Sequence, residues 1–295
     1  MDYPIWFNGA WKPANEVYVS VKDIGFLRGY GIFDFFRIMD GKPIFLAEHL
    51  ARLQRSAEKI GIELPYSLDE LSTCIYELAG ITSDSCLGVK IVLTGGESSN
   101  GYLPNQPNLW ILPAVFQFTD PAKGMRLMSK EFVREMADIK SLNYAFGISN
   151  LPEMKAAGAD DLIYYTAQHG VSESTRSNLF YVKNGEVFTP AAHILEGITR
   201  MKVLELARKR YKVHVQTCSL DEFLSADEVF TTGSTKRVVP ILAIDGKKIG
   251  DGIRGPVAMH LYDELLGAES LLRRITSRIS LVETRYFASV PQVKN

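Results

Sequence analysis

The chain has 295 residues, of which 46% are hydrophobic and 23% charged, and its 33 basic and 34 acidic side chains leave a formal net charge of −1. A chain of this length and composition forms one large or two smaller domains with a sizeable core, and its charge balance favours small-molecule partners over nucleic acid or an anionic membrane. No apolar run approaches the roughly 18 residues of a membrane span, and residues 1–6 lack the features of a signal peptide, so we expect a cytoplasmic protein.

The first part of the chain predicts antiparallel strands joined by tight turns. Asn8-Gly9 lies between two short apolar runs, which is a strong hairpin pattern, and Asp40-Gly41 is another turn. The segment 25–31 is punctuated by glycines and is expected to be a loop. Strands are therefore predicted at residues 4–7, 16–21, 32–39, 87–93 and 109–118.

Two helices are predicted among these strands. After residue 45 the apolar side chains change period and recur at steps of three and four, at Leu46, Leu50, Leu53, Ala57 and Ile60. A second helix is predicted at 68–79. Arg52 lies off the apolar stripe of the first helix, and its ordinary interpretation is a solvated arginine.

A polar, turn-rich segment from Thr119 to Gly124 separates the two halves of the chain. We place the domain boundary there, with a smaller N-terminal α/β domain at 1–119 and a larger C-terminal domain at 120–295. The pattern of residues 268–295 is charged and ambiguous. The second domain predicts strands at 125–128, 161–167, 178–182, 186–188, 228–232, 240–244 and 247–249, and helices at 152–158, 199–210 and 255–266.

The chain has three cysteines, Cys74, Cys86 and Cys218. An odd number at wide spacing suits neither a disulfide framework nor a zinc site. We expect reduced, structural cysteines and no bound metal.

A lysine and a glutamate of the second domain have the character that a pyridoxal 5'-phosphate (PLP) enzyme needs. Lys140 lies in the turn 138–144, and Glu173 lies in the hydroxyl-rich segment 171–178. A lysine can form a Schiff base with PLP, and an acid can pair with the nitrogen of its pyridinium ring. Taken alone, this lysine and glutamate are only weak support for a PLP site, because most lysines and glutamates are solvated surface groups.

Two further segments could receive the phosphate of such a cofactor. Residues 196–200 place a glycine and Thr199 at the start of a predicted helix, where free N–H groups can bind an anion. Residues 231–235 form a second hydroxyl-rich turn after a strand. Taken singly, Thr199 could be only a helix cap and the other turn only a loop.

Six sequence blocks in a fixed order make the pattern far more specific. They extend over most of the chain, from about residue 17 to 262, at Arg28–Asp34, His49–Leu53, Ile139–Asn143, Glu173–Asn178, Ile194–Arg200 and Thr232–Thr235. In this order they resemble the class IV, or fold type IV, PLP aminotransferases, which include D-amino-acid and branched-chain aminotransferases and aminodeoxychorismate lyase. The resemblance implies an α/β (α+β) fold of two domains, each with a mixed sheet and flanking helices, and a homodimer with active sites near the subunit interface.

The resemblance also implies a role for individual residues. Lys140 is the Schiff-base lysine, Glu173 pairs with the pyridine nitrogen, and Leu195 lies against the face of the ring. The residues that the resemblance assigns to the phosphate are Arg52, Ile198, Thr199, Ser234 and Thr235.

Departures from the family concern the substrate. The loop 95–103 lacks the arginine and histidine with which D-amino-acid enzymes hold the α-carboxylate. The aromatic substrate position is Phe33, and the following Asp34-Phe35 stands where branched-chain enzymes have Glu-Gly and lyases tend to have threonines, so we expect a crowded pocket. Ser174 replaces the usual glycine after the cofactor glutamate.

Two arginines offer another way to hold the carboxylate. Arg28 precedes the strand of Phe33, and Arg176 lies in the cofactor turn at a position that is usually small in the family. We hypothesise that both bind the substrate carboxylate, because a guanidinium can pair with it through two hydrogen bonds. The alternative is that they form structural salt bridges or face solvent.

The predicted function is transfer of an amino group from a D-amino acid to an α-keto acid such as 2-oxoglutarate, in two half-reactions. The blocks at 139–143 and 194–200 look most like the D-amino-acid branch. The alternatives are a branched-chain L-amino-acid aminotransferase, an (R)-amine transaminase, an aminodeoxychorismate lyase, or a non-catalytic binding protein on the same scaffold.

Overall fold

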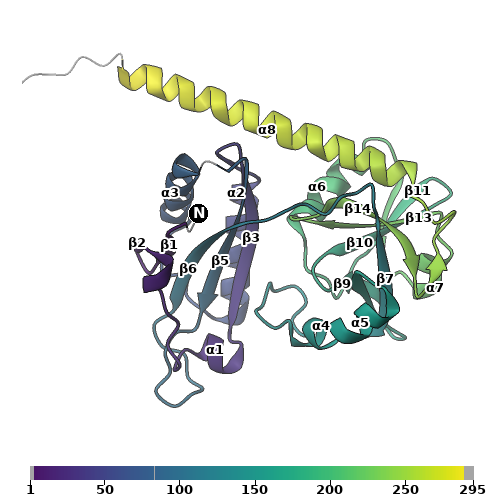
Figure 1. Cartoon of the computed structure of the whole chain (residues 1–295), viewed down its shortest axis with the longest axis horizontal. Coiled ribbons are helices and arrows are strands. Elements are labelled where there is room, and N and C mark those ends of the chain that lie inside the picture. Colours follow the sequence, from purple (N-terminus) through teal and green to yellow (C-terminus); the bar gives the residue numbers. More distant parts are fainter. Residues whose placement is uncertain (1–2, 83, 289–295) are drawn as a thin grey trace, which may run out of the picture.

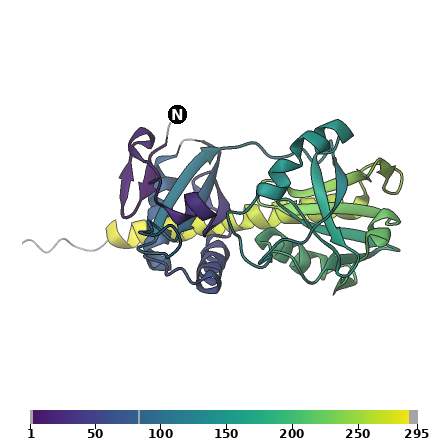
Figure 2. The same cartoon turned by 90° about the horizontal axis from the view of Figure 1, so that it is seen from below.

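The structure is a computed structural model that describes residues 3–82 and 84–288. Two sheets lie next to each other, and one long C-terminal helix passes both of them (Figure 1). The view from below shows the same arrangement, with the helix running along both domains (Figure 2). Within the described residues, no helix is both long enough and apolar enough to cross a membrane.

The first sheet is antiparallel throughout. Its described strands follow the order β2 (Ala10–Lys12), β1 (Ile5–Phe7), β6 (Asn108–Val115), β5 (Cys86–Thr94), β3 (Gly31–Met39) and β4 (Lys42–Pro43). Three helices accompany it, α1 (Ile24–Arg28), α2 (Leu46–Ile60) and α3 (Leu68–Ile81). The apolar stripe of α2 is buried in one core with β3, β5 and α3, as its period predicts.

Two expectations for the start of the chain are wrong. The partner of the first strand is β2 and not residues 16–21, because the two-residue turn at Asn8-Gly9 pairs Phe7 directly with Ala10. Residues 17–20 have no regular secondary structure, and Tyr18 is largely exposed. The expected loop at 25–31 contains the helical turn α1, which Asp23 caps by accepting a hydrogen bond from the Gly25 N–H at 2.7 Å.

The second sheet is mixed and curls on itself. Its strand order is β12 (Val213–Gln216), β11 (Glu186–Pro190), β10 (Asn178–Lys183), β13 (Glu228–Gly233), β14 (Arg237–Ile244), β7 (Met125–Glu131), β8 (Asp161–Thr166) and β9 (Gly170–Ser174), with β15 (Lys247–Lys248) beside β14. β9 also pairs with β10 through Glu173 and Asn178. The ring of strands from β10 to β9 is thereby closed, and Glu173 lies where it closes.

The helices of the second half are α4 (Ala145–Ser149), α5 (Leu151–Ala157), α6 (Ile198–Ala207), α7 (Leu220–Leu224) and α8 (Pro256–Ala288). The short elements α4, α7, β9 and β12 are absent from the predicted set.

The division at 119/120 falls in the connection between β6 and β7, that is, between the two sheets, and it stays our proposed boundary.

The helix α8 continues far beyond the predicted end at 266. Its first turns bury Ala258, Leu261 and Leu265 against α6, β13 and β14, which is the apolar pattern that predicts its beginning. Farther along, polar contacts described below replace this stripe. Glu228 on β13 holds the first turn, because its carboxylate accepts hydrogen bonds from the Val257 and Ala258 N–H groups at 3.0 and 2.9 Å.

We expect Glu228→Ala to lower the free energy of unfolding by about 1–2 kcal/mol, the usual effect of removing a helix cap, since two N–H groups of α8 lose their acceptor. Urea unfolding followed by circular dichroism measures the change. Glu264→Ala, at an exposed position of the same helix, is the control. Equal unfolding midpoints for the two variants would contradict the capping role.

Candidate active site

The backbone around Lys140 extends the first sheet although it follows the second sheet's first strand in sequence. The Phe33 N–H donates to the Lys140 carbonyl at 2.9 Å, and the Leu142 N–H donates to the Gly31 carbonyl at 3.1 Å. Ile32 and Ser141 form a bridge between these bonds. A Cβ at Gly31 would lie 2.7 Å from the Leu142 side chain, so the glycine permits this close pairing. The first domain thus sets the position of Lys140.

The amine of Lys140 lies in a site that disfavours its charged form. Burial, together with the guanidinium groups of Arg52 and Arg134, lowers the pKa of Lys140 to about 7, although Asp34 and Glu173 oppose the shift. Its Nζ lies 4.5 Å from the centroid of the Phe33 ring. A large fraction of the amine is therefore neutral and nucleophilic near neutral pH.

Glu173 is a buried carboxylate with two protein donors. Its Oε1 accepts a hydrogen bond from Arg134 Nε, and its Oε2 accepts one from the Leu195 N–H, both at 2.9 Å. Burial raises the pKa of Glu173, and the Arg134 charge and the two hydrogen bonds oppose this effect. A carboxylate has about four lone-pair positions, so Glu173 can still accept a further donor.

Arg134 joins Glu173 to the segment that precedes Lys140. Its Nη1 donates to the Ile139 carbonyl at 2.7 Å, and its Nη2 donates to the Ala137 carbonyl. Sequence reasoning missed this residue, because a single arginine outside the six blocks has no local pattern that separates it from a solvated one. Its side chain fixes the spacing between the lysine and the glutamate.

Arg52 is held by an acid that the sequence analysis treated only as a source of crowding. Asp34 accepts hydrogen bonds from Arg52 Nε and Nη2, both at 2.8 Å, and from His49 Nδ1 at 2.7 Å. Burial would raise the pKa of Asp34, but the charges and hydrogen bonds of Arg52 and His49 lower it. The bidentate pair fixes the guanidinium plane, and Nη1 reaches the Glu196 carbonyl at 3.4 Å.

These groups surround one pocket of about 470 Å³, measured with its open mouth. The beginning of α6 forms one wall. Gly197 supplies no side-chain cap, and the first N–H groups of a helix have no partner within it. A Cβ at Gly197 would lie 2.2 Å from Asn178 Oδ1. The predicted residues that line the pocket are Arg52, Lys140, Glu173, Arg176, Leu195, Ile198, Thr199 and Ser234.

Three predicted residues lie outside this lining in the described chain. Phe33 lies just beyond it, next to Lys140 and 5.7 Å from the ring of Tyr144, a lining residue. Thr235 follows Ser234 in the same turn. Arg28 lies on α1 and donates from Nε to the Gly101 carbonyl at 3.2 Å. One chain therefore does not bring Arg28 and Arg176 together, and their shared role stays a prediction.

Two hydroxyl groups of the pocket are left without a partner by the described residues. Ser177 Oγ and Thr232 Oγ1 are buried and lack a hydrogen bond within residues 3–82 and 84–288. Buried hydroxyls without a hydrogen-bond partner are rare, and a bound group with acceptor oxygens would satisfy both. Together with Arg52 and the N-terminus of α6, they favour an anion with several acceptor oxygens.

Comparison with known proteins agrees with this chemistry. The family described as Amino-transferase class IV matches residues 31–244. The D-alanine aminotransferase of Bacillus licheniformis is 32% identical over 88% of this chain and 95% of its own length. A putative branched-chain-amino-acid aminotransferase of Methanocaldococcus jannaschii is 30% identical over 88% of this chain and 94% of its own. The T.th. branched-chain amino acid aminotransferase, solved with pyridoxamine 5'-phosphate, has a TM-score of 0.85 at 29% identity and covers 92% of this chain and 96% of its own.

The cofactor of class IV aminotransferases is PLP, and the pocket residues fit it. Lys140 offers an amine with a lowered pKa, and Glu173 offers a buried carboxylate with lone pairs to spare. The start of α6, Arg52 and the two unsatisfied hydroxyls suit a phosphate. The fold, the cofactor and the family implied by the sequence are therefore confirmed, while the individual residue roles stay predictions.

We expect the rate at which added PLP attaches to the cofactor-free protein to rise with pH through about 7 and then to level off. Below this pKa the amine is protonated and cannot attack, whereas a lysine with an ordinary pKa near 10.4 would keep gaining rate up to about that pH. Borohydride trapping followed by mass spectrometry measures attachment, and Lys140→Ala is the control without an amine. A rate that still climbs above pH 9 would contradict the lowered pKa.

Proposed function

The chain belongs to the class IV aminotransferases, and we propose that within this family it transfers the amino group of a D-amino acid to an α-keto acid such as 2-oxoglutarate. The main support for transamination is that Lys140 and Glu173 line one pocket with a candidate anion site beside them. Support for the D-enantiomer comes from the similarity to the D-alanine aminotransferase of Bacillus licheniformis. We also propose a cytoplasmic location, which rests on sequence features alone.

Each residue has a chemical task in this proposal. When bound, PLP supplies an electron sink for the charge that develops at the substrate α-carbon. Glu173 stabilises positive charge at its end of the pocket, and Arg134 supports the charged form of Glu173. Arg52 and the start of α6 hold the phosphate. Lys140 Nζ would take the proton from the substrate α-carbon as a general base and, as a general acid, deliver it to the cofactor carbon rather than back to the α-carbon. A pKa of about 7 allows Lys140 to act both as base and as acid near neutral pH.

The amino and keto acids use the pocket in turn. Transamination consists of two half-reactions in which the product of the first leaves before the second substrate binds. One carboxylate-binding group can therefore serve both. Arg176 is the candidate, because its exposed guanidinium lines the pocket beside the unsatisfied hydroxyl of Ser177.

A second candidate function is transfer from branched-chain L-amino acids. The similarity to the T.th. branched-chain enzyme and to the Methanocaldococcus relative favours it. The sequence predicts that Phe35 crowds the pocket and so disfavours branched-chain substrates. In the structure, Phe35 packs against Phe116, with ring centroids 5.9 Å apart, and lies outside the described lining of the pocket. This argument against branched-chain substrates is therefore weakened. The two substrate classes share the cofactor residues, so the distinction lies in the carboxylate and side-chain contacts.

Arg28 has a role in this proposal only if a second copy of the chain is present. The segments around it expose apolar side chains, on α1 at Phe26 and in the loop between β5 and β6 at Tyr102 and Leu103. We propose that this surface joins two chains in a homodimer, so that Arg28 can approach the pocket of the other copy. The exposed Arg28–Gly101 contact keeps α1 and the loop 97–103 together.

We expect D-alanine or D-glutamate to bleach the visible absorbance of the protein-bound cofactor faster than the matching L-amino acids do. Single-turnover half-reactions with paired D- and L-amino acids, including D- and L-leucine, measure this preference. Equal or greater reactivity with L-leucine would favour the branched-chain candidate instead. A protein with no such absorbance band after incubation with PLP would overturn the activity altogether.

We expect Arg176→Ala to weaken substrate binding in the half-reaction by roughly 10- to 100-fold, the effect of losing a charge-assisted pair worth about 1.5–3 kcal/mol, while PLP affinity changes little. Arg126→Ala, at another exposed arginine of the second domain, is the matched control. Arg28→Ala should match Arg176→Ala only if Arg28 reaches a neighbouring pocket. Unchanged substrate affinity in Arg176→Ala would remove the proposed contact.

A further inference from the structure

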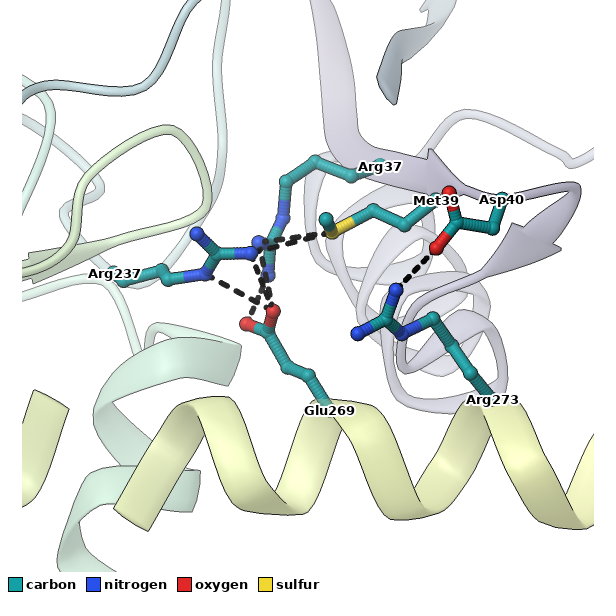
Figure 3. Close-up of polar contacts among 6 residues, drawn as sticks. All are labelled: Arg37, Met39, Asp40, Arg237, Glu269 and Arg273. Atoms are coloured by element: carbon teal, nitrogen blue, oxygen red, sulfur yellow. Dashed lines mark hydrogen bonds and ion pairs between the residues drawn. The ribbon is translucent and has the colours of Figure 1, made fainter. Parts of the chain in front are cut away.

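A buried ionic cluster outside the described lining of the pocket joins the two domains. Glu269 points from α8 between Arg37 of β3 and Arg237 of β14 (Figure 3). Its Oε1 accepts from Arg37 Nη2 at 2.7 Å, and its Oε2 accepts from Arg237 Nε and Nη2 at 3.0 and 2.9 Å. Glu269 is only 1% exposed and Arg37 only 2%. One carboxylate therefore connects a strand of each sheet through well-formed charged hydrogen bonds.

The connection between the domains closes this cluster. Phe118 lies between β6 and β7, and its ring centroid is 3.8 Å from the guanidinium carbon of Arg237 and 5.2 Å from that of Arg37. Met39 Sδ accepts weak hydrogen bonds from both arginines. The cluster thus contacts the first sheet, the second sheet, the connection and α8 at one point.

The position of Glu269 follows from the pattern of α8. Ala258, Leu261 and Leu265 are buried against the second domain, and Glu269 continues the same face at the next step of four. One turn later Arg273 pairs with Asp40 after β3. The face of the helix changes from apolar to charged at the place where it leaves the second domain and reaches the first. We call the segment from Leu265 to Arg273 the strap.

The two strands held by Glu269 are each connected to the cofactor pocket, although its described lining contains no residue of either strand. On β3, Arg37 follows Asp34, which fixes Arg52. In the second domain, Arg237 ends the turn that begins at Gly233 and includes the lining residue Ser234. A shift of either arginine relative to the other would therefore change the distance between the two halves of the pocket.

We propose that Glu269 is a positioning residue, and that the strap holds the two domains at the separation that the PLP pocket requires. Breaking the cluster opens the pocket across the domain junction, which weakens the hold of Arg52 on the phosphate and moves Lys140 relative to Glu173. This inference rests on the aminotransferase activity of the family and not on the preference for D-amino acids. The assays therefore use whichever amino donor the wild-type protein converts.

The decisive variant is Arg37→Met, because it removes the buried link of Glu269 to the first domain and leaves both the Glu269–Arg237 pair and the partly exposed Arg273–Asp40 pair in place. We expect the half-reaction rate constant to fall roughly 10- to 100-fold, as displacements of about 1 Å can cause. We also expect weaker PLP binding to the cofactor-free protein and faster hydrogen exchange in residues 116–124. Arg37→Lys keeps the charge with fewer donors and should lie between wild type and Arg37→Met.

Glu269→Gln tests the same cluster from the helix, and Glu264→Gln, at an exposed position of α8, is its matched control. Glu269→Gln should change rate, PLP affinity and exchange in the same direction as Arg37→Met, and Glu264→Gln should change none of them. The opposite result is that the cluster variants melt at lower temperatures than wild type, while their folded molecules keep the wild-type rate constant, PLP affinity and hydrogen exchange. That result would mean that the cluster only stabilises the fold, and it would overturn the proposal.

Discussion

The pairing of residues 140–142 with β3 is the constraint on which the site depends. Two backbone hydrogen bonds place Lys140, the proposed Schiff-base lysine, beside a strand of the first sheet. Phe33 and Asp34 lie next in that strand after Ile32. The aromatic ring next to the Lys140 amine and the acid that orients Arg52 therefore belong to the same strand, β3. The position of Lys140 in the pocket depends on this pairing between the two sheets, which is why we propose that contacts outside the pocket lining bear on its chemistry.

The buried carboxylates at the site each have cationic partners. Asp34 pairs with Arg52 and Glu173 with Arg134, and Asp161 pairs with Lys236 near the turn of Ser234. Removing one partner of such a buried pair typically costs roughly 3–5 kcal/mol, whereas exposed pairs such as Lys183–Asp227 contribute roughly 0–1 kcal/mol. The buried pairs therefore fix the geometry, and the surface pairs do not. Asp34 holds the Arg52 guanidinium in one orientation, which would lower the entropic cost of binding the phosphate that we propose it holds.

The parts of the molecule that could be predicted from the sequence are those with local causes. The period of α2, the turn at Asn8-Gly9 and the helix start at Gly197 depend on neighbouring residues, and the six blocks identify the family, within which Lys140 and Glu173 are our candidate residues. Arg134 could not be found this way, since its role depends on a strand and a loop that only the fold brings together. The same holds for Glu269, whose partners lie on strands of two different sheets. Residues 16–21 have a strand composition, but the tight turn before them pairs the first strand with β2 instead.

The proposed cofactor residues and the proposed substrate residues lie in different surroundings. This difference explains why sequence similarity alone does not identify the amino acid that donates the amino group. Glu173 and Arg52 are buried and hydrogen-bonded, Glu173 to Arg134 and Leu195 and Arg52 to Asp34, so a change at either one disturbs several partners at once. Arg176 is exposed at the pocket and Arg28 lies on an exposed helix, where replacement disturbs little else. Substrate preference can therefore change while the cofactor residues stay the same, and relatives at 32% and 30% identity can carry the names of different substrates. Our proposal therefore assigns substrate specificity to these few exposed groups, together with the residues that a second copy of the chain would place opposite them.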